Sequence, residues 1–117
     1  MSAVVIWHNP RCSKSREALA LLRARGIEPE IVPYLETPPS PAEIGRILDL
    51  LGMEPRALMR RKELAYRAGG FADPALSREA LIAAMAETPV LIERPVVLSG
   101  GKAVLGRPPE AILSILP

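Results

Sequence analysis

The sequence contains few of the residues that build disulfides and metal sites. Cysteine and histidine occur once each, as Cys12 and His8. A single cysteine excludes an internal disulfide, and one cysteine with one histidine is too small a set for a structural zinc site. If Cys12 takes part in redox chemistry, the second sulfur must therefore come from another molecule.

Aromatic residues and long apolar runs are also scarce. The chain has one tryptophan, two tyrosines and one phenylalanine, too few for a platform on which bases stack, and no basic run long enough to follow a phosphate backbone. No apolar run is long enough to cross a bilayer, and the N-terminus lacks the pattern of a signal peptide. We therefore expect a cytoplasmic protein with no nucleic-acid or membrane partner.

The composition does provide an apolar core and many guanidinium groups. The 117 residues are 49% hydrophobic and 24% charged, as in an ordinary soluble domain, so we expect one domain over residues 1–117. Of the 15 basic residues, 12 are arginine. The planar fork of arginine donors fits carboxylates and tetrahedral oxyanions, so this bias favours an anionic ligand.

The first part of the chain predicts a strand, a helix and a second strand. Residues 3–7 form a short β-branched apolar run, which is typical of a buried strand. Residues 13–25 then carry apolar side chains on one helical face, and this helix should end at Gly26. A second strand is expected at 30–35, where Pro33 indicates an edge position or a strand end.

The middle of the chain predicts a helical insertion over roughly residues 40–88. Ser40 begins a capping box with proline at the first helical position, and apolar residues then repeat at helical spacing. A short helix is expected from Pro55 into the basic residues 60–62. A loose stretch follows, and then a helix capped by Ser77.

The last part of the chain predicts a hairpin and a final helix. The apolar segments 96–98 and 103–105 flank a Gly-Gly pair, which is a tight-turn signal, and a double proline then starts the last helix. With the first two strands parallel, this order predicts an α/β thioredoxin-like fold, a four-stranded mixed sheet with the helical insertion between the second and third strands. In that fold the bond before Pro95 is usually cis, but the sequence does not fix its isomer.

The segment HNPRCSKSR, residues 8–16, is the candidate reactive site. Cys12 lies where a strand turns into a helix, with Ser13 available as the N-cap. Free N–H groups and the positive end of the helix dipole favour both a thiolate and a bound oxyanion there. A buried structural cysteine is the alternative, but the charged and polar neighbours of Cys12 favour a reactive one. His8 could lie near the thiol and influence its ionisation.

Two arginines outside this segment differ from the solvated ones. Arg94 and Arg107 each precede a proline at the end of an apolar segment, and in a thioredoxin-like layout both fall at the sheet edge that carries the cysteine. Arg60 is ambiguous, because it could belong to a basic helix end facing solvent. The spacing from the cysteine to Arg16 does not fit the C-x5-R phosphatase motif, and Ser15 replaces the second cysteine of a C-x-x-C motif.

Four segments together resemble the glutaredoxin-coupled arsenate reductases, the ArsC family. They are HNPRCSKSR at 8–16, YLETPPS at 34–40, RPVVL at 94–98 and GRPPE at 106–110, so the resemblance covers nearly the whole chain. It implies the thioredoxin-like fold with a helical insertion. It also implies a set of catalytic residues, namely Cys12, His8, Arg60, Arg94 and Arg107.

The resemblance gives each of these residues a role. Cys12 matches the nucleophile and His8 the histidine linked to its ionisation, whereas the three arginines match those that hold the oxyanion and the arsenic intermediate. The expected oxyanion site consists of Cys12, Ser13, Ser15, Arg16, Arg60, Arg94 and Arg107. No metal and no tightly bound cofactor is expected.

The implied reaction is the reduction of arsenate to arsenite. An arsenate dianion bound by arginine forks and helix N–H groups would be attacked by the Cys12 thiolate. Because the chain has no second cysteine, glutathione would act as the co-substrate that resolves the adduct, and glutaredoxin would then regenerate the thiol. Arsenate, glutathione and glutaredoxin are thus the expected partners.

Two other functions stay open on the sequence. One is a glutathione-dependent thiol-transfer protein of the same fold without arsenate activity, which only an arsenate assay separates from the enzyme. The other is a non-enzymatic regulator of the Spx type, which binds RNA polymerase. Such regulators commonly carry a C-x-x-C redox switch, so Ser15 and the matched arginines argue against this function.

Overall fold

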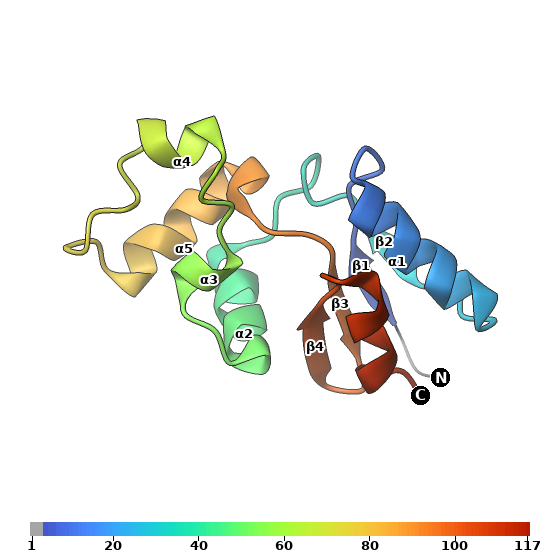
Figure 1. Cartoon of the computed structure of the whole chain (residues 1–117). Coiled ribbons are helices and arrows are strands. Elements are labelled where there is room, and N and C mark those ends of the chain that lie inside the picture. The colour runs from blue at the N-terminus through green and yellow to red at the C-terminus, as the bar shows by residue number, and fades with distance from the viewer. Residues whose placement is uncertain (1–3) are drawn as a thin grey trace. The chain divides into compact units, whose positions relative to one another are not determined.

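The computed structural model describes residues 4–117 and contains a four-stranded mixed sheet (Figure 1). The strands are β1 (Val5–Trp7), β2 (Glu30–Val32), β3 (Val96–Ser99) and β4 (Lys102–Leu105), in the order β2-β1-β3-β4. β1 and β2 are parallel, whereas β3 pairs antiparallel with both β1 and β4. The predicted mixed sheet is confirmed, and the predicted strand start at residue 3 lies outside the described residues.

β2 is an edge strand and ends directly before Pro33, as the proline indicates. The prediction of a strand as far as residue 35 is wrong, because the chain turns at once and the N–H groups of Glu36 and Thr37 both donate to the Pro33 carbonyl at 2.9 Å. The turn buries Tyr34, whose ring stacks on Trp7 at a centroid distance of 6.5 Å. The chain therefore turns after β2 and places Tyr34 against Trp7, where the sequence predicts further strand residues.

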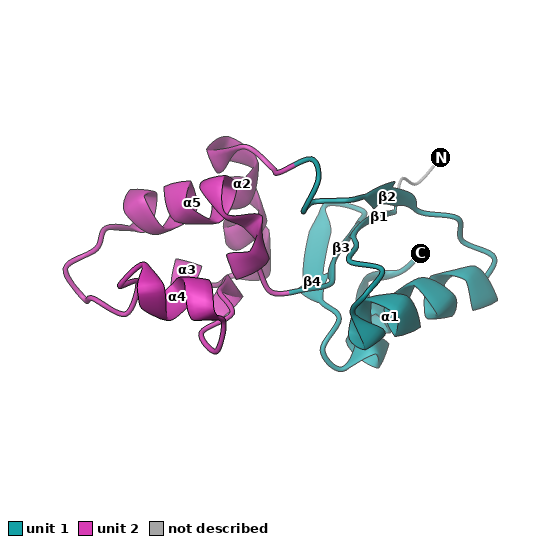
Figure 2. Ribbon diagram, turned by 90° about the horizontal axis from the view of Figure 1, so that it is seen from above, with its two compact units in different colours: residues 1–37, 94–117 teal, residues 38–93 magenta. Residues whose placement is uncertain are grey.

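The described chain divides into two compact units (Figure 2). Among the described residues, the sheet unit comprises 4–37 and 94–117, and the helical unit comprises 38–93. The helical unit enters the chain between β2 and β3, which confirms the helical insertion between the second and third strands.

The core of the sheet unit lies between the sheet and two helices. α1 (Ser13–Ala24) and the 3₁₀ helix η2 (Pro109–Ile115) contact each other and pack against the sheet. Their inward side chains form one cluster with those of the strands, made of Val4, Ile6, Ala18, Leu22, Val97 and Ile112. Burying a large aliphatic side chain contributes about 1.5–3 kcal/mol. The cluster therefore fixes α1, and the segment that precedes it, on the sheet.

Four α helices and one 3₁₀ helix make up the helical unit. They are α2 (Pro41–Leu51), α3 (Pro55–Leu58), α4 (Leu64–Ala68), α5 (Arg78–Glu87) and η1 (Pro89–Leu91). The two helices predicted after Ser40 and Ser77 are present as α2 and α5, each burying apolar residues, and the structure shows that they pack on each other. Between residues 4 and 117, no helix is long and apolar enough to span a bilayer.

The predicted helix from Pro55 into residues 60–62 is wrong in its second half. α3 ends before Met59, whose backbone is extended and pairs with Ile92 in an antiparallel bridge. The N–H of Arg60 then donates to the Leu91 carbonyl at 2.7 Å. These bonds to the returning chain take the place of further helical turns, so Arg60 does not lie at a basic helix end.

The loose stretch that the sequence predicts around Gly69-Gly70 is a series of turns, but α4, directly before it, was not predicted. This helix has five residues, and Tyr66 is the one that it buries. The Tyr66 ring lies against Phe71 at a centroid distance of 6.2 Å. The helix buries a single aromatic side chain. One buried residue does not give the repeating apolar pattern by which a helix is predicted from sequence.

The predicted N-caps of α2 and α5 are confirmed by hydrogen bonds, and the end of α2 has the dihedral angles of a glycine cap. Ser40 accepts a hydrogen bond from the Glu43 N–H at 3.1 Å, and Ser77 does the same for the Ala80 N–H at 3.1 Å. Gly52 ends α2 with a φ of 66°, a left-handed conformation that favours glycine. Local polar side chains thus fix where these helices begin.

The predicted hairpin is also confirmed. Gly100 and Gly101 connect β3 and β4 with φ values of 57° and 77°. Two consecutive positive φ angles match the turn whose twist suits a two-residue hairpin, and only glycine adopts them at little cost. The turn sets the register that pairs Val96 with Leu105.

We expect Ser40→Ala to lower the free energy of unfolding by about 1 kcal/mol, because the Glu43 N–H loses its acceptor. Chemical denaturation followed by circular dichroism measures the change. Ser40→Asp keeps an acceptor at the same position and should retain most of the stability. Equal losses in the two variants would show that the cap contributes nothing.

Candidate active site

Cys12 lies at the edge of the sheet where three strand ends meet. β1 and β2 both end at this edge, and antiparallel β3 starts there, directly after Arg94 and Pro95. The loop after β1 turns so that the Cys12 N–H donates to the Asn9 carbonyl at 3.0 Å. The fold therefore brings the start of α1 and the start of β3 together around the cysteine.

Cys12 is itself the N-cap of α1, so the prediction of Ser13 as N-cap is wrong. Cys12 has extended angles, φ −92° and ψ 123°, and its carbonyl accepts the first helical hydrogen bond, from the Arg16 N–H at 3.0 Å. Ser13 is the first helical residue. The sulfur thus occupies the place where a serine or aspartate oxygen would cap the helix.

Opposing effects set the ionisation of Cys12, whose side chain is largely shielded with the residue 7% exposed. Burial raises the pKa of the thiol, whereas the backbone N–H of Ser15, the side chain of Arg94 and the backbone N–H of Lys14 lower it, and the net pKa lies below the ordinary value. The sulfur makes no capping hydrogen bond of normal geometry. Even so, helix N–H groups and a guanidinium together favour the thiolate.

The structure places Arg94 beside the cysteine and links Arg107 to the Arg94 backbone. Arg94 forms a side-chain hydrogen bond with the Cys12 sulfur. Arg107 donates from Nη1 to the Arg94 carbonyl at 3.2 Å. The peptide bonds to Pro95 and Pro108, which follow these arginines, are both cis. Arg94 is therefore the matched arginine that acts on the sulfur, and the place of Arg107 in the oxyanion site stays a prediction.

His8 is buried and faces Ser15. Its Nδ1 lies 2.6 Å from the Ser15 hydroxyl, which also accepts the Asn9 N–H at 3.1 Å. The tautomer of the His8 ring sets which of the two groups donates in this short hydrogen bond. Burial, and then the charges of Arg23 and Arg16, hold the pKa of His8 below its ordinary value, which agrees with a neutral ring.

Ser15 and Arg16 both support the loop, although the sequence places them in the oxyanion site. The Ser15 side chain is fully buried, so its hydroxyl serves His8 and Asn9, and its backbone N–H is the group that faces the sulfur. Arg16 is exposed and donates from Nη1 to the Pro10 carbonyl at 2.9 Å. Binding of an oxyanion by Ser13, Ser15 and Arg16 stays a prediction.

Asn9 is a functional residue that the sequence reading missed. Its side-chain oxygen accepts the Arg11 N–H at 3.0 Å, and its carbonyl accepts the Cys12 N–H. An asparagine that binds the backbone two residues later is a recognised turn former, and the Asn-Pro pair was a detectable signal. Asn9 therefore shapes the loop that presents the cysteine.

Arg60 belongs to the helical unit and is held by two carboxylates there. Its Nη1 lies 2.7 Å from the Glu63 carboxylate and its Nε lies 3.7 Å from the Glu93 carboxylate. The side chain is 28% exposed. These pairs offset its positive charge within the unit, and a role for Arg60 in the oxyanion site stays a prediction.

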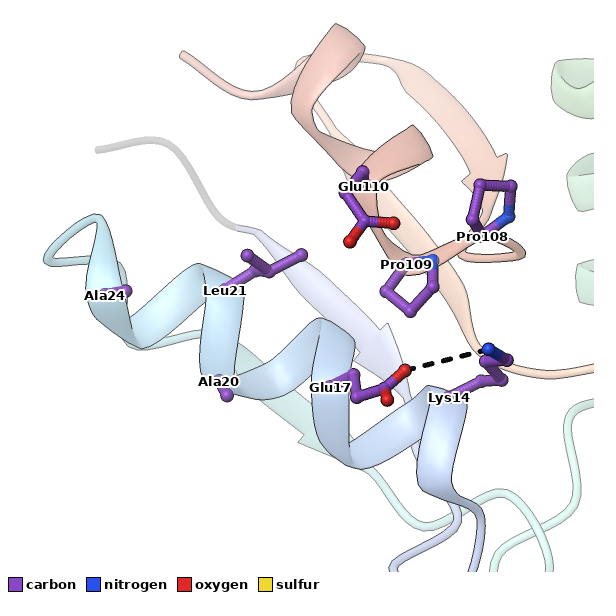
Figure 3. Close-up of a pocket in the computed structure, with 8 residues that line it drawn as sticks. All are labelled: Lys14, Glu17, Ala20, Leu21, Ala24, Pro108, Pro109 and Glu110. Carbon is purple, nitrogen blue, oxygen red and sulfur yellow. Dashed lines mark ion pairs between the residues drawn. The ribbon is translucent and has the colours of Figure 1, made fainter.

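Two grooves flank the start of α1 in the sheet unit. The β2 groove, of about 530 Å³, is lined by His8, Asn9, Pro10, Arg11, Ile31, Pro33, Leu35 and Glu36. The α1 groove, of about 570 Å³, lies between α1 and the start of η2, with Lys14 and Glu17 paired at 3.9 Å along it (Figure 3). Among residues 4–117, no group of histidine, cysteine and carboxylate side chains could hold a metal ion.

We expect Arg94→Met to raise the pKa of Cys12, because both a hydrogen bond to the sulfur and a nearby positive charge are removed. A pH titration of the ultraviolet absorbance of the thiolate measures the change. Arg25→Met, at the exposed far end of α1, is the matched control and should leave the titration as it is. Identical curves for Arg94→Met and the unaltered protein would contradict this electrostatic assignment.

We expect the imidazole of His8 to titrate below its ordinary pKa of 6.5. The unfolded chain binds the proton more readily than the folded one, so this contribution to stability is complete above pH 6.5 and is lost as the pH falls through the folded pKa. NMR titration reports it directly, since His8 is the only histidine. Unfolding of His8→Asn at several pH values is the control, and a midpoint above 6.5 would refute the neutral ring.

Comparison with known proteins agrees with this geometry. The ArsC family model matches residues 7–115. The structure of arsenate reductase from Vibrio cholerae is 56% identical and covers 97% of this chain and 98% of its own, with a TM-score of 0.96. The uncharacterized protein YfgD of Escherichia coli K12 is 55% identical over 114 residues, 97% of this chain and 96% of its own. Arsenate reductase of Neisseria meningitidis serogroup A is 49% identical over 117 residues, 99% of this chain and 100% of its own. The chain therefore belongs to the ArsC family.

Proposed function

We propose that this protein reduces arsenate to arsenite, with Cys12 as the nucleophile and with glutathione and glutaredoxin as the source of electrons. The observation that carries the proposal is a single cysteine at a helix start whose pKa is lowered by helix N–H groups and Arg94. Relatives named arsenate reductase that span the whole chain support the same reaction. In this proposal the groups that lower the pKa of Cys12 also suit the binding of an oxyanion.

Arsenate at neutral pH is a tetrahedral anion that needs several donors. The first turn of α1 offers backbone N–H groups, Arg94 offers a guanidinium group beside Cys12, and Arg107, bonded to the Arg94 carbonyl, is the further arginine of the proposed site. Charge-assisted hydrogen bonds from such groups bind the anion and offset the charge that develops on its oxygens during attack. The same groups that stabilise the thiolate thus also receive the substrate.

In the first step the Cys12 thiolate attacks the arsenic atom. A sulfur–arsenic bond forms, and one arsenate oxygen takes up protons and leaves as water. Arsenic remains in its pentavalent state at this point. The thiolate fraction at neutral pH sets the rate of this step, because an ordinary thiol with a pKa of about 8.5 is only a few per cent ionised there.

In the second step a glutathione thiolate attacks the Cys12 sulfur. A sulfur–sulfur bond forms, the sulfur–arsenic bond breaks, and its electron pair passes to arsenic, which leaves as trivalent arsenite. A glutaredoxin thiolate then attacks the glutathione sulfur of the mixed disulfide and releases the Cys12 thiolate. An external thiol is required because Cys12 is the only cysteine of the chain.

His8 acts in this proposal as a positioning residue. Its ring is hydrogen-bonded to the Ser15 hydroxyl, and that hydroxyl accepts the Asn9 N–H. The bonds keep the loop in the shape that presents the Cys12 sulfur to the helix N–H groups. His8 thus influences ionisation of the thiol through Ser15. Arg60 is the third proposed arginine, matched by the family resemblance.

We expect Cys12→Ser to abolish arsenite formation in an assay that contains arsenate, glutathione and glutaredoxin. Omitting either thiol component from the unaltered protein should stop turnover as well. Arg94→Lys should reduce kcat/KM for arsenate about 10- to 100-fold, because a point charge does not replace a guanidinium fork. Arg25→Lys is the matched control and should keep full activity.

The same assay separates this function from simple thiol transfer. Mass spectrometry after treatment with glutathione disulfide should show one glutathione on Cys12 in either case. A protein that accepts this adduct but forms no arsenite under any of these conditions would contradict the proposal. Retained turnover in Cys12→Ser would contradict the mechanism.

A further inference from the structure

The β2 groove lies beside the Cys12 loop and is not used by the oxyanion site. Its volume of about 530 Å³ is within the range of about 300–1,000 Å³ typical of small-ligand sites. Arg11, the residue before Cys12, lies in its wall, so one end of the groove is next to the nucleophile. Two of the three large hydrophobic side chains exposed on the described surface, Ile31 and Leu35, line it.

The charges around the β2 groove fit a short zwitterionic peptide. Arg11 and Glu36 line it and are exposed, and neither side chain has an ion-pair partner in the described part of the chain. A guanidinium can take a carboxylate and a carboxylate can take an ammonium group. Glutathione carries both groups, with an uncharged cysteinyl residue between its ends that suits the apolar wall of Ile31 and Leu35.

The backbone of β2 offers further bonds to a peptide. Glu30 donates to the Val4 carbonyl and Val32 accepts from the His8 N–H, so both face β1. In a parallel pair the residue between them, Ile31, directs its N–H and C=O away from the partner strand. No strand of the described chain covers that outer side of β2. An extended peptide can therefore pair with Ile31 by strand addition.

The order of the strands places this groove on the correct side for the chemistry. β1 lies between β2 and β3, so Arg94 before β3 and the groove beside β2 flank the Cys12 loop from opposite sides. Displacement at sulfur needs the attacking thiolate to enter opposite the leaving arsenic. In the proposed site arsenic is held at Arg94, so a thiolate bound in the β2 groove approaches Cys12 from a different side of the loop.

We propose that the β2 groove is the glutathione subsite, in which Arg11 and Glu36 hold the charged groups of the tripeptide and Ile31 pairs with its backbone. This proposal rests on the proposed function, since it names the place from which glutathione attacks Cys12. The bound thiolate forms the bond to the Cys12 sulfur while the sulfur–arsenic bond breaks and its electrons pass to arsenic.

Binding can be tested without the reaction, using the unaltered protein labelled with ¹⁵N and S-methylglutathione, which cannot form a disulfide. We expect backbone NMR shifts centred on residues 31–36 and Arg11. Glu36→Lys should weaken these shifts about tenfold in apparent affinity. Glu110→Lys, a matched reversal in the α1 groove, should leave them unchanged. Shifts centred on residues 94–96 or on the α1 groove, or no shifts at millimolar ligand, would overturn the subsite.

Kinetics give a second readout that separates this proposal from the function itself. In the arsenite assay, Arg11→Glu and Glu36→Lys should raise KM for glutathione about tenfold each and leave KM for arsenate unchanged. If arsenite forms with glutathione but these KM values do not move, the subsite is wrong and the function stands. If S-methylglutathione binds the groove but no arsenite forms, the function is wrong and the subsite stands.

Discussion

The interaction on which the site depends is the balance at the Cys12 sulfur between burial and positive charge. Burial alone would keep the thiol protonated, and helix N–H groups with Arg94 reverse that effect. The reversal needs the sulfur at the N-cap itself, because the free N–H groups of a helix converge only there. A cysteine one turn later would keep its burial and lose these donors.

The balance depends in turn on how the loop is held. Ser15 is buried under the loop and binds His8 on one side and the Asn9 backbone on the other. Asn9 then accepts the Cys12 N–H through its carbonyl. A buried hydroxyl with every bond satisfied fixes one arrangement, whereas an unsatisfied one would be costly. The apolar packing of α1 on the sheet fixes the other end of this network.

Much of this architecture follows from local sequence signals, and the exceptions have physical reasons. Ser40, Ser77 and the pair of glycines after β3 act through their own backbone surroundings, so their helix and turn positions can be predicted. The end of α3 is decided by the returning chain at Ile92, and α4 by one ring contact. Contacts between segments distant in the sequence leave no local pattern.

The sequence predicts the helix N–H groups around Cys12 better than the exact geometry of the loop. The position of Cys12 between a strand and a helix predicts the helix N–H groups, but the N-cap moved by one residue because the Asn9 carbonyl takes the Cys12 N–H. The sequence predicts that Ser15 binds the oxyanion. In the structure its hydroxyl is buried and bonded to His8 and the Asn9 N–H. Direction of a side chain depends on packing, which a motif does not encode.

The three matched arginines are also unequal in a way that no motif reveals. Arg94 contacts the sulfur, and Arg107 uses one donor on the Arg94 backbone, so its position follows that of Arg94. Arg60 is paired with Glu63 and Glu93, and two neighbouring carboxylates offset the field of one guanidinium. Three arginines that match the same family motif therefore do not have the same electrostatic effect on the Cys12 sulfur. On this geometry, Arg94 is the matched arginine that lowers the pKa of Cys12.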